Sequence, residues 1–401
     1  MCSSDLGRGA AAYLDVAAVV AAALDSDADA VHPGYGFLSE RADLARTCED
    51  AGLRFVGPSP DHLARLGDKA AARMLAVACG VPVVPGTDGP VTAAEAGAFL
   101  AALGPGAAVM LKAVAGGGGR GMRAVTDPAE VAEAFERCRS EALAAFGDGS
   151  IYAERLVRRA RHIEVQVLGD GTDVIALGDR ECTLQRRNQK LVELAPALEL
   201  PDATRAGLAA ASVAMARELG YRSLGTFEFL VDADDPTWFA FIEANARLQV
   251  EHTVTEEVTG LDLVALQLRV AGGARLAEVG LDPAAPPKSV GRAVQLRINT
   301  EAMAADGSVT PTGGTLSLFE APPGPGARTD TAARTGTVTH PGFDSLLAKV
   351  ICRAPGDDLA GLFRLARRTL DELRIGGVAT NAAFLAALLD HPAVSSGPVT
   401  T

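Results

Sequence analysis

The sequence predicts an α+β protein with more than one hydrophobic core. Its 401 residues are enough for two or three domains. Helical and strand patterns are interleaved up to about residue 156, and the sequence that follows is rich in strands. The segment 225–245 consists of two aromatic, β-rich runs around the turn Asp-Ala-Asp-Asp-Pro, which is typical of a β-hairpin. This mixture indicates an α+β fold.

The first region, residues 1–66, is expected to be a partial α/β unit. Residues 1–11 show no pattern, and the first helix, at 13–24, has no strand before it. The other expected elements are a strand at 30–31, a helix at 41–51 and a strand at 54–56. The pattern therefore predicts a unit that begins partway through, with its first strands missing.

The second region, residues 67–280, is expected to contain a small subdomain at 83–156. The elements of this subdomain surround a run of glycines, and they are a helix at 93–103, strands at 109–114 and 122–125, a helix at 128–146 and a strand at 151–156. The elements after it are strands within 162–179, a helix at 202–219, the hairpin and a helix at 256–271. The third region, residues 281–401, has a Pro- and Gly-rich β segment and ends with a helical pattern at 357–373.

The composition excludes several classes of protein. A net charge of −13 argues against non-specific binding to nucleic acid. No apolar run reaches the length of a membrane span, and no signal peptide is recognisable. The six cysteines are scattered without a CxxC pair, which indicates reduced thiols and a cytoplasmic protein.

The alternation in segment 241–256 is the strongest indication of a functional site. Side chains at i, i+2 and i+4 of an extended strand share one face. One face would be apolar, and the other would hold only groups that bind metals, anions or protons, namely Glu243, Asn245, Arg247, Gln249 and Glu251. The sequence therefore predicts a polar site on this strand.

A metal site is one interpretation of the hairpin. If its turn is centred between Asp235 and Pro236, Glu228 lies directly across from Glu243. Like charges facing each other across a sheet destabilise it unless a cation lies between them. With Asn245 they form a set of hard oxygen donors that suits Mg²⁺. The alternative is a solvated edge hairpin whose acids never meet.

The glycine run at 116–119 is a second candidate site. Glycines allow consecutive N–H groups to cradle an anion, and Lys112 can reach a phosphate as a point charge. A Walker A loop needs Gly-Lys-Ser/Thr opening a helix, and a Rossmann fingerprint also leads into a helix, whereas a strand follows here. The spacing favours a mobile phosphate lid over a hairpin tip that binds nothing.

Four further signals are weak when taken singly. Glu154 ends a strand and can accept a hydrogen bond from an adenine amino group, although exposed strand-end acids are common. The basic run at 182–190 is either an anion-binding segment or a solvated face. The loop HPGYGFLSE, which contains Tyr35, reads only as a structured loop. Arg297 lies in an apolar strand, where an arginine needs an anionic partner.

Together these motifs resemble the biotin carboxylase members of the ATP-grasp superfamily over nearly the whole chain. The matching segments, in the family's order and spacing, are HPGYGFLSE, GPSPDHLARLGDK, VPVVPGTDGP, GGGGRGM, QRRNQK, GTFEFL, FIEANARLQVEHTVTE, LRINTE, FDSLLAK and GGVATN. HPGYGFLSE together with RLQVEHTVTE is specific to biotin carboxylases. The resemblance implies a partial pre-ATP-grasp domain at 1–66, an ATP-grasp region at 67–280 with a mobile lid at 83–156, and a biotin carboxylase C-terminal domain at 281–401.

The resemblance also implies a reaction and a set of ligands. ATP phosphorylates bicarbonate to carboxyphosphate, which gives CO₂ to N1 of biotin on a carrier protein. Residues implied for ATP are Lys69, Lys112, Gly118, Gly119, Glu154, Leu156, His162, Gln185 and Asn188. Those implied for Mg²⁺ or Mn²⁺ are Glu228, Glu243 and Asn245. Those implied for bicarbonate and biotin are Lys190, Arg247, Gln249, Val250, Glu251, Arg297 and Tyr35.

Four of these residues are implied to be catalytic. Glu251 would deprotonate bicarbonate, which Lys190 and Arg247 would hold. Arg297 would stabilise the biotin enolate while N1 attacks, as electrostatic stabilisation of developing charge.

The chain also departs from the family pattern. Asn188 stands where many members carry His, and Ala115 replaces one glycine of the lid. Leu194 and Leu198 replace residues that are usually acidic and proline, a puzzling change close to the expected active site. The chain is expected to be truncated at its N-terminus and to stop before the family's usual end. It has no Met-Lys-Met biotin-attachment site, so the expected partners are a separate biotin carrier, a carboxyltransferase and, at full length, a second copy.

Two other interpretations remain open. A different ATP-grasp ligase is disfavoured because Arg247, Gln249, Glu251 and Arg297 are all present. A fragment that binds ATP or a carboxylase partner without turnover is the other, since missing strands would expose a sheet edge. The expected enzyme is a ligase, the biotin carboxylase component of an acyl-CoA carboxylase-type enzyme, for which fatty acid biosynthesis is one expected setting. Its final acceptor (acetyl-CoA, propionyl-CoA, another CoA, pyruvate or urea) is not specified, because the carboxyltransferase chooses it.

Overall fold

A computed structural model describes residues 9–114, 121–187, 189–322, 324–395, 397 and 399–400. Three of the residues implied for ATP, Gly118, Gly119 and Asn188, lie outside the described residues, as does Ala115 of the lid. Within the described part, no helix is long and apolar enough to cross a membrane.

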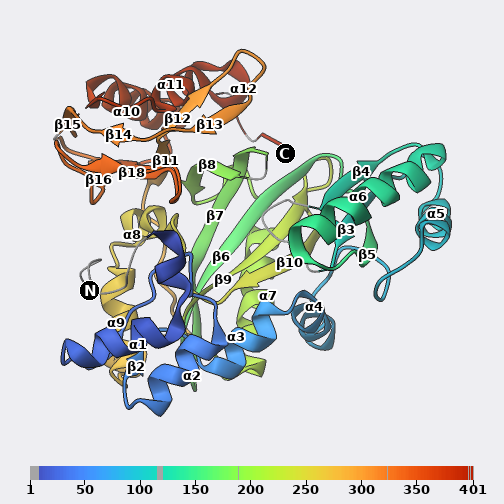
Figure 1. Cartoon of the computed structure of the whole chain (residues 1–401), viewed down its shortest axis with the longest axis horizontal. Coiled ribbons are helices and arrows are strands. Elements are labelled where there is room, and N and C mark those ends of the chain that lie inside the picture. The colour runs from blue at the N-terminus through green and yellow to red at the C-terminus, as the bar shows by residue number, and fades with distance from the viewer. Residues whose placement is uncertain are drawn as a thin grey trace.

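An eight-stranded antiparallel sheet organises the molecule (Figure 1). The strands, in spatial order, are β10 (Phe239–Asn245), β9 (Arg222–Asp232), β6 (Ala160–Asp170), β7 (Val174–Arg186), β8 (Gln189–Ala195), β11 (Arg292–Asn299), β18 (Leu346–Ala354) and β16 (Ala327–Asp330). Because β8 pairs with β11, one continuous sheet joins the expected ATP-grasp region to the C-terminal region. The prediction of a mixed helix-and-sheet fold is confirmed.

The hairpin of β9 and β10 has the predicted register. Glu243 pairs with Glu228, and Asn245 pairs with Thr226. The register shifts between Phe241 and Glu243, so the strands bulge at this point. Paired residues share a face, and the two glutamates therefore project from the same side of the sheet. Aromatic residues of the hairpin, among them Phe227 and Phe241, pack into the main core on the other side.

The strand prediction for the segment after Asn245 was wrong. β10 ends at Asn245, residues 246–251 form a loop, and α8 (His252–Thr259) follows. The chain leaves the strand because the N–H of His252 bonds to the carbonyl of Gln249 and closes a turn. The helix expected at 256–271 is also divided. Gly260, with φ 74°, ends α8, and Asp262 caps α9 (Leu263–Ala271).

A small three-stranded sheet with its own core lies beside the large sheet, on the right in Figure 1. Its elements are β4 (Met122–Val125), β3 (Val109–Ala113) and β5 (Ile151–Arg155), with α5 (Ala93–Ala102), η2 (Pro128–Glu130) and α6 (Val131–Phe146). These elements agree with the predicted ones to within a few residues. Strand β5 ends at the edge of the cleft described below, which brings Glu154 to it.

The N-terminal elements pack beneath the large sheet. They are η1 (Ala10–Leu14), α1 (Val16–Asp25), β1 (Ala30–Val31), α2 (Ala42–Asp50), β2 (Arg54–Phe55), α3 (Pro60–Gly67) and α4 (Lys69–Ala78). The sequence patterns did not predict α3 and α4. Both begin at a capping side chain, since Ser59 accepts from the N–H of His62 and Asp68 from those of Ala70 and Ala71. The apolar residues of this region join the core under β6, β9 and β10, together with α7 (Asp202–Glu218).

The C-terminal region extends the large sheet and covers it with helices. Its helices are α10 (Leu359–Glu372), α11 (Ala382–Asp390) and α12 (Pro392–Ser395). Its short elements are β12 (Glu301–Met303), β13 (Val309–Pro311), β14 (Gly314–Thr315), β15 (Leu318–Glu320), β17 (Val338–Thr339) and β19 (Arg374–Gly376), and η3 (Ala277–Val279) precedes the region. A core of β8, β11, β18 and these helices lies away from the cleft.

Leu194 and Leu198 belong to this second core. Both are buried, and they pack in the same cluster as Phe363 and Val394. Neither residue lines the cleft. The two departures from the family pattern are therefore changes in the packing of this core and not in the lining of the cleft.

Truncating Leu194 is expected to destabilise the protein. The change Leu194→Ala removes a side chain that is only 5% exposed, and such changes cost about 2 to 4 kcal/mol in the free energy of unfolding. Leu268→Ala is the matched control, because Leu268 is 49% exposed and should cost little. Denaturant unfolding of both variants measures the difference. Equal midpoints for the two variants would contradict the packing role of Leu194.

Candidate active site

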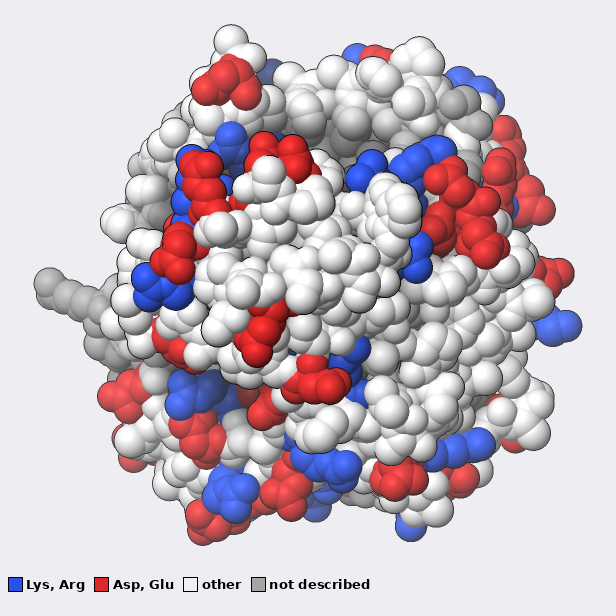
Figure 2. Space-filling model, turned by 90° about the vertical axis from the view of Figure 1, so that its right-hand side faces the viewer, with Lys and Arg blue, Asp and Glu red and all other residues white. Residues whose placement is uncertain are grey.

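A cleft of about 1580 Å³ lies between the small sheet, helix α4 and the polar face of the large sheet. This volume exceeds the ~300–1,000 Å³ of typical small-ligand sites, so the cleft has room for more than one substrate. The predicted site residues that line it are Lys69, Lys112, Glu154, Leu156, His162, Gln185, Lys190, Glu228, Glu243, Asn245, Arg247, Gln249, Val250, Glu251 and Arg297. Figure 2 views the molecule from the side of the small sheet, where acidic and basic side chains are interspersed around a hollow near the top.

Tyr35 is the one described residue of the predicted set that does not line this cleft. Partial burial raises the pKa of its phenol, and the positive charge of Arg297 opposes that shift. Its side chain is 37% exposed and is close enough to Arg297 to be affected by its charge.

Lys190 lies at the centre of three carboxylates. Its Nζ is 2.6 Å from Glu164, 3.1 Å from Glu228 and 2.6 Å from Glu251. Burial alone would lower the pKa of this amine, but the three glutamates outweigh burial and hold the pKa well above its ordinary value. Lys190 is therefore a firmly charged cation inside the cleft, next to the predicted base.

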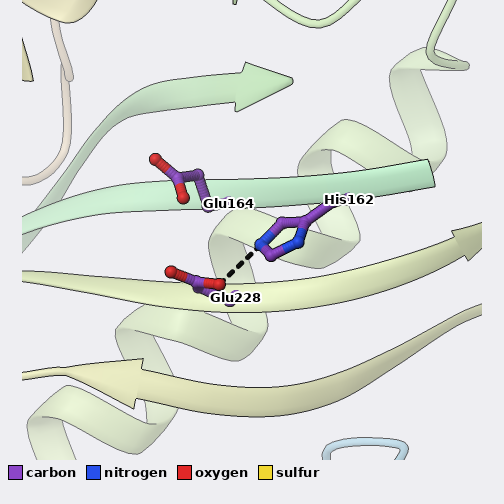
Figure 3. Close-up of side chains that lie close together, drawn as sticks. All are labelled: His162, Glu164 and Glu228. Atoms are coloured by element: carbon purple, nitrogen blue, oxygen red, sulfur yellow. Dashed lines mark ion pairs between the residues drawn. The ribbon is translucent and has the colours of Figure 1, made fainter. Parts of the chain in front are cut away.

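Glu228 accepts hydrogen bonds from side chains of several elements. Its Oε1 accepts from Asn245 at 2.7 Å and from Gln249 at 2.8 Å, in addition to Lys190. Its other oxygen, Oε2, lies 2.5 Å from Nε2 of His162. Figure 3 shows this pair on the neighbouring strands β6 and β9. Burial would raise the pKa of Glu228, but Lys190 and His162 outweigh it and hold the pKa well below its usual range. Glu228 is therefore an ionised carboxylate.

The predicted metal ligands lie on one face of the hairpin. Glu228 and Glu243 are cross-strand partners, and Asn245 is two residues along the same strand. Burial and the negative charge of Glu228 raise the pKa of Glu243, as expected for two facing carboxylates. In this structure the amide nitrogen of Asn245 points to Glu228, and its oxygen accepts from Arg247. The donor set fits Mg²⁺.

Glu251 lies between two cations. Its carboxylate is 2.6 Å from Lys190 and 3.0 Å from Nη2 of Arg297. Burial favours protonation, but Lys190 and Arg297 outweigh it and hold the pKa of Glu251 far below its ordinary value. Arg297 is held in turn by the buried Glu193, which accepts from its Nε at 2.5 Å. This explains how an arginine is accommodated within an apolar strand.

Two of the residues predicted to bind ATP bind each other in this structure. Lys112 forms an ion pair with Glu154. The N–H of Leu156 donates to the carbonyl of Ala108, so this N–H is already used within the protein. Gln185 donates to Nδ1 of His162 at 3.0 Å and so connects to the Glu228 cluster. A ligand that used both Lys112 and Glu154 would have to separate them.

Three site residues were missed by the sequence reasoning, namely Glu164, Arg180 and Glu193. All three are buried charged residues on the central strands of the sheet. The sequence does indicate Glu164, because the polar residues His162, Glu164 and Gln166 alternate with the apolar Ile163 and Val165. The polar residues near Glu243 alternate in the same way. Arg180 stands between Asp179 and Glu181, and Glu193 lies within an apolar run, so neither position reveals its partner in the fold.

His252 is expected to make the protein acid-sensitive. Burial and the nearby positive charge of Lys349 lower the pKa of His252 to about 3. A histidine in an unfolded chain has a pKa near 6.5, so between these values the unfolded state binds more protons and stability falls as the pH falls. Because of this group, the free energy of unfolding should be about 1 kcal/mol lower at pH 5.5 than at pH 7.5.

The variant His252→Asn isolates this contribution. Its amide can replace the ring Nδ1, which lies 2.7 Å from the carbonyl of Gln249. The unfolding free energy of both proteins at pH 7.5 and 5.5 measures the effect. Burial also lowers the pKa of His62, but His62 is present in both proteins, so its contribution to the pH dependence cancels when the two are compared. An identical loss of stability in the variant would show that His252 is not the cause.

Three family models match the chain in sequence order. The model described as "Biotin carboxylase, N-terminal domain" matches residues 3–63. The model "Carbamoyl-phosphate synthase L chain, ATP binding domain" matches residues 68–279, which is more than half of the chain. The model "Biotin carboxylase C-terminal domain" matches residues 295–401.

Among curated relatives, Pyruvate carboxylase 1 of Caenorhabditis elegans is 47% identical over 401 residues, covering 99% of this chain and 33% of that protein. The chain thus spans about a third of the length of the curated relatives it matches. A solved structure described as the biotin carboxylase domain of a single-chain bacterial carboxylase is 52% identical, with a TM-score of 0.85, and covers 97% of this chain and 83% of that one. The biotin carboxylase domain dimer of the Hydrogenobacter thermophilus 2-oxoglutarate carboxylase, with MgADP, ADP and bicarbonate, is 39% identical with a TM-score of 0.88 and covers 97% and 84%.

Proposed function

Because this chain belongs to the biotin carboxylase family, we propose that it carries out the ATP-dependent carboxylation of carrier-bound biotin with bicarbonate, through carboxyphosphate. This is the first half-reaction of a biotin-dependent carboxylase. The proposal extends to the roles of individual residues in this cleft.

The convergence of Lys190 and Arg297 on Glu251 is the observation that carries the proposal. Both cations contact the same buried carboxylate, at 2.6 and 3.0 Å. A small anion that must lose a proton is the substrate that suits such a site, because the cations hold its charge while the carboxylate takes the proton. Bicarbonate is that kind of anion.

The anion itself brings the base into its working range. In this structure Lys190 and Arg297 lower the pKa of Glu251, so that the carboxylate is a weak base. Bicarbonate bound against these cations offsets part of their charge and places a like charge beside Glu251. Both effects raise the pKa of Glu251 and strengthen it as a base. The bicarbonate hydroxyl then gives its proton to Glu251, and its oxygen attacks the γ-phosphorus of ATP. The bond from that phosphorus to the bridging oxygen breaks, so that ADP leaves and carboxyphosphate forms.

ATP binding separates the ion pair at the other end of the cleft. Lys112 turns to the phosphates, and Glu154 accepts from the adenine amino group. Lys69, Gln185 and His162 line the cleft beside them. Glu228, Glu243 and Asn245 would hold Mg²⁺, which neutralises charge on the phosphates when it is bound. The amide of Asn245 must turn its oxygen from Arg247 to the metal for this.

Arg297 serves the second step, in which carboxyphosphate breaks down to CO₂ and phosphate, N1 of biotin gives its proton to that phosphate, and N1 attacks the CO₂. Its guanidinium stabilises the negative charge that develops on the ureido oxygen of biotin as N1 becomes nucleophilic. Glu193 fixes the orientation of Arg297 through its Nε at 2.5 Å. Tyr35, within electrostatic reach of Arg297, flanks the place where biotin enters.

The partners proposed for this chain are a biotin carrier, a carboxyltransferase and a second copy of the chain. The curated relative named above is a pyruvate carboxylase, and one solved relative is a long-chain acyl-CoA carboxylase. Pyruvate and an acyl-CoA are therefore both candidate acceptors, and the role in fatty acid biosynthesis belongs only to the second. The five described cysteines are free, which supports a reducing compartment such as the cytosol; the human relative is named as mitochondrial.

ADP release with bicarbonate and free biotin tests the function. Biotin- and bicarbonate-dependent ADP release from the chain supports biotin carboxylation. ATP binding without turnover would instead identify a fragment that binds but does not catalyse. Activity with another acid and no biotin dependence would favour another ATP-grasp ligase.

A further inference from the structure

Arg180, on β7, is a fully buried arginine that does not line the cleft. Its three side-chain nitrogens all donate hydrogen bonds, and these reach four different elements. The acceptors are Glu164 at 2.5 Å from Nε, Gln166 and Thr255 at 2.8 and 2.9 Å from Nη1, and Thr226 and Gln249 at 3.1 and 3.0 Å from Nη2. A buried guanidinium with a complete set of partners holds those partners in fixed positions.

One bond of Arg180 decides the orientation of the Gln249 amide. A guanidinium has only donors, so it can bind the amide oxygen of Gln249 but not its nitrogen. With the oxygen turned to Arg180, the amide nitrogen is turned to Glu228, at 2.8 Å. Gln249 therefore presents N–H groups to the cleft, which it lines. An N–H donor is the group that an anion such as bicarbonate requires.

A second bond of Arg180 acts on Lys190. One oxygen of Glu164 accepts from Arg180, and the other lies 2.6 Å from Nζ of Lys190. Arg180 thus fixes one oxygen of Glu164 while the other oxygen of Glu164 binds Lys190. Without Arg180, Glu164 would carry an unbalanced charge in a buried site and would draw Lys190 away from Glu251.

We propose that Arg180 is a positioning residue of the bicarbonate site, which orients Gln249 and Lys190 from a buried position on the same face of the sheet without touching the substrate. The inference rests on the function proposed above, because it concerns how bicarbonate is held. Its consequence is specific. Losing Arg180 should weaken the binding of bicarbonate more than the binding of ATP.

Arg161 provides a matched control. It is also a buried arginine, 3% exposed, on the neighbouring strand β6. It binds Glu181 through two nitrogens, at 3.0 and 2.8 Å, and it also donates to the carbonyl of Leu198. Neither partner lines the cleft. Arg161→Met should therefore disturb folding as Arg180→Met does, without acting on the bicarbonate site.

Steady-state ADP release by the whole chain, measured against bicarbonate and against ATP, tests the proposal. Arg180→Met should raise KM for bicarbonate on the order of 10- to 100-fold, with KM for ATP changed less than about threefold. Arg161→Met should leave both KM values near those of the unchanged protein. Equal effects of the two variants on KM for bicarbonate would overturn the proposal, because Arg180 would then matter only for stability.

A second variant keeps the test decisive if Arg180→Met does not fold. The double change Thr226→Val and Thr255→Val removes two uncharged hydrogen-bond acceptors of the Arg180 guanidinium. It leaves the charge of Arg180 and the volume of the two replaced side chains nearly unchanged. It should raise KM for bicarbonate several-fold at unchanged KM for ATP. An unchanged KM for bicarbonate in this folded variant would overturn the proposal. Absence of bicarbonate-dependent ADP release in the unchanged protein would instead reject the proposed function.

Discussion

Replacing Glu251 with glutamine is expected to lower kcat for biotin- and bicarbonate-dependent ADP release by about 10²- to 10⁴-fold, the usual contribution of a general base. Glutamine has nearly the same shape and keeps one oxygen to accept from Lys190 or Arg297. It cannot take the proton of bicarbonate. The loss should therefore fall on kcat, and KM for ATP should change little, because Glu251 lies at the opposite end of the cleft from the Lys112–Glu154 pair.

The control for this experiment is Glu256→Gln. Glu256 is another buried carboxylate, one turn into helix α8, and it is 2.8 Å from Arg328. It does not line the cleft, so its loss should leave kcat close to the original value. Measuring kcat and the unfolding midpoint of both variants separates chemistry from stability. A Glu251→Gln protein that stays folded and keeps its kcat would remove Glu251 as the base.

Replacing Glu228 with glutamine is expected to raise the Mg²⁺ concentration needed for half-maximal activity by about 100-fold, with a loss of kcat as well. The change removes one proposed metal ligand, which weakens binding of the ion. It also places an amide N–H₂ among groups that donate to this position, namely Lys190, Asn245 and Gln249. At least one of these donors is then left without an acceptor, at a cost typical of a buried unsatisfied group.

The matched variant is Glu243→Gln, the other carboxylate of the pair. It should also raise the Mg²⁺ requirement, but with a smaller loss of kcat, because Glu228 binds Lys190 and Gln249 of the bicarbonate site directly and Glu243 acts on Lys190 through charge. Titration of activity with Mg²⁺ at saturating ATP measures both effects. An unaltered Mg²⁺ requirement in folded Glu228→Gln would show that this carboxylate is not a metal ligand.

The success and failure of the strand predictions have the same physical origin. Local alternation predicted the hairpin, and the turn predicted that Glu228 faces Glu243, because both features depend on neighbours in sequence. The same alternation continues past Asn245, but the chain does not continue as a strand. Polar residues at every second position bring side chains to one site either along a strand or around a loop. Only the bond between His252 and Gln249 distinguishes the two.

Leu194 and Leu198 show that closeness in sequence does not place two side chains in the same site. The family resemblance placed the stretch that contains Leu194 close to the expected active site, a few residues after Lys190 in the sequence. Strict alternation along β8 would place Lys190 and Leu194, four residues apart, on the same face. The β7–β8 pairing is irregular, with register shifts, and Lys190 lines the cleft while Leu194 packs into a different core. Proximity in sequence was therefore a poor guide to proximity in space.

The sequence by itself determined the set of chemical groups and most of the secondary structure, because motif spacing and side-chain periodicity are local properties. It did not determine which charges neutralise one another. Only the tertiary structure placed Lys190 among Glu164, Glu228 and Glu251, and Arg180 beneath Gln249. These partners come from strands and loops far apart in the chain, and the balance of burial against their charges depends on the folded arrangement as a whole.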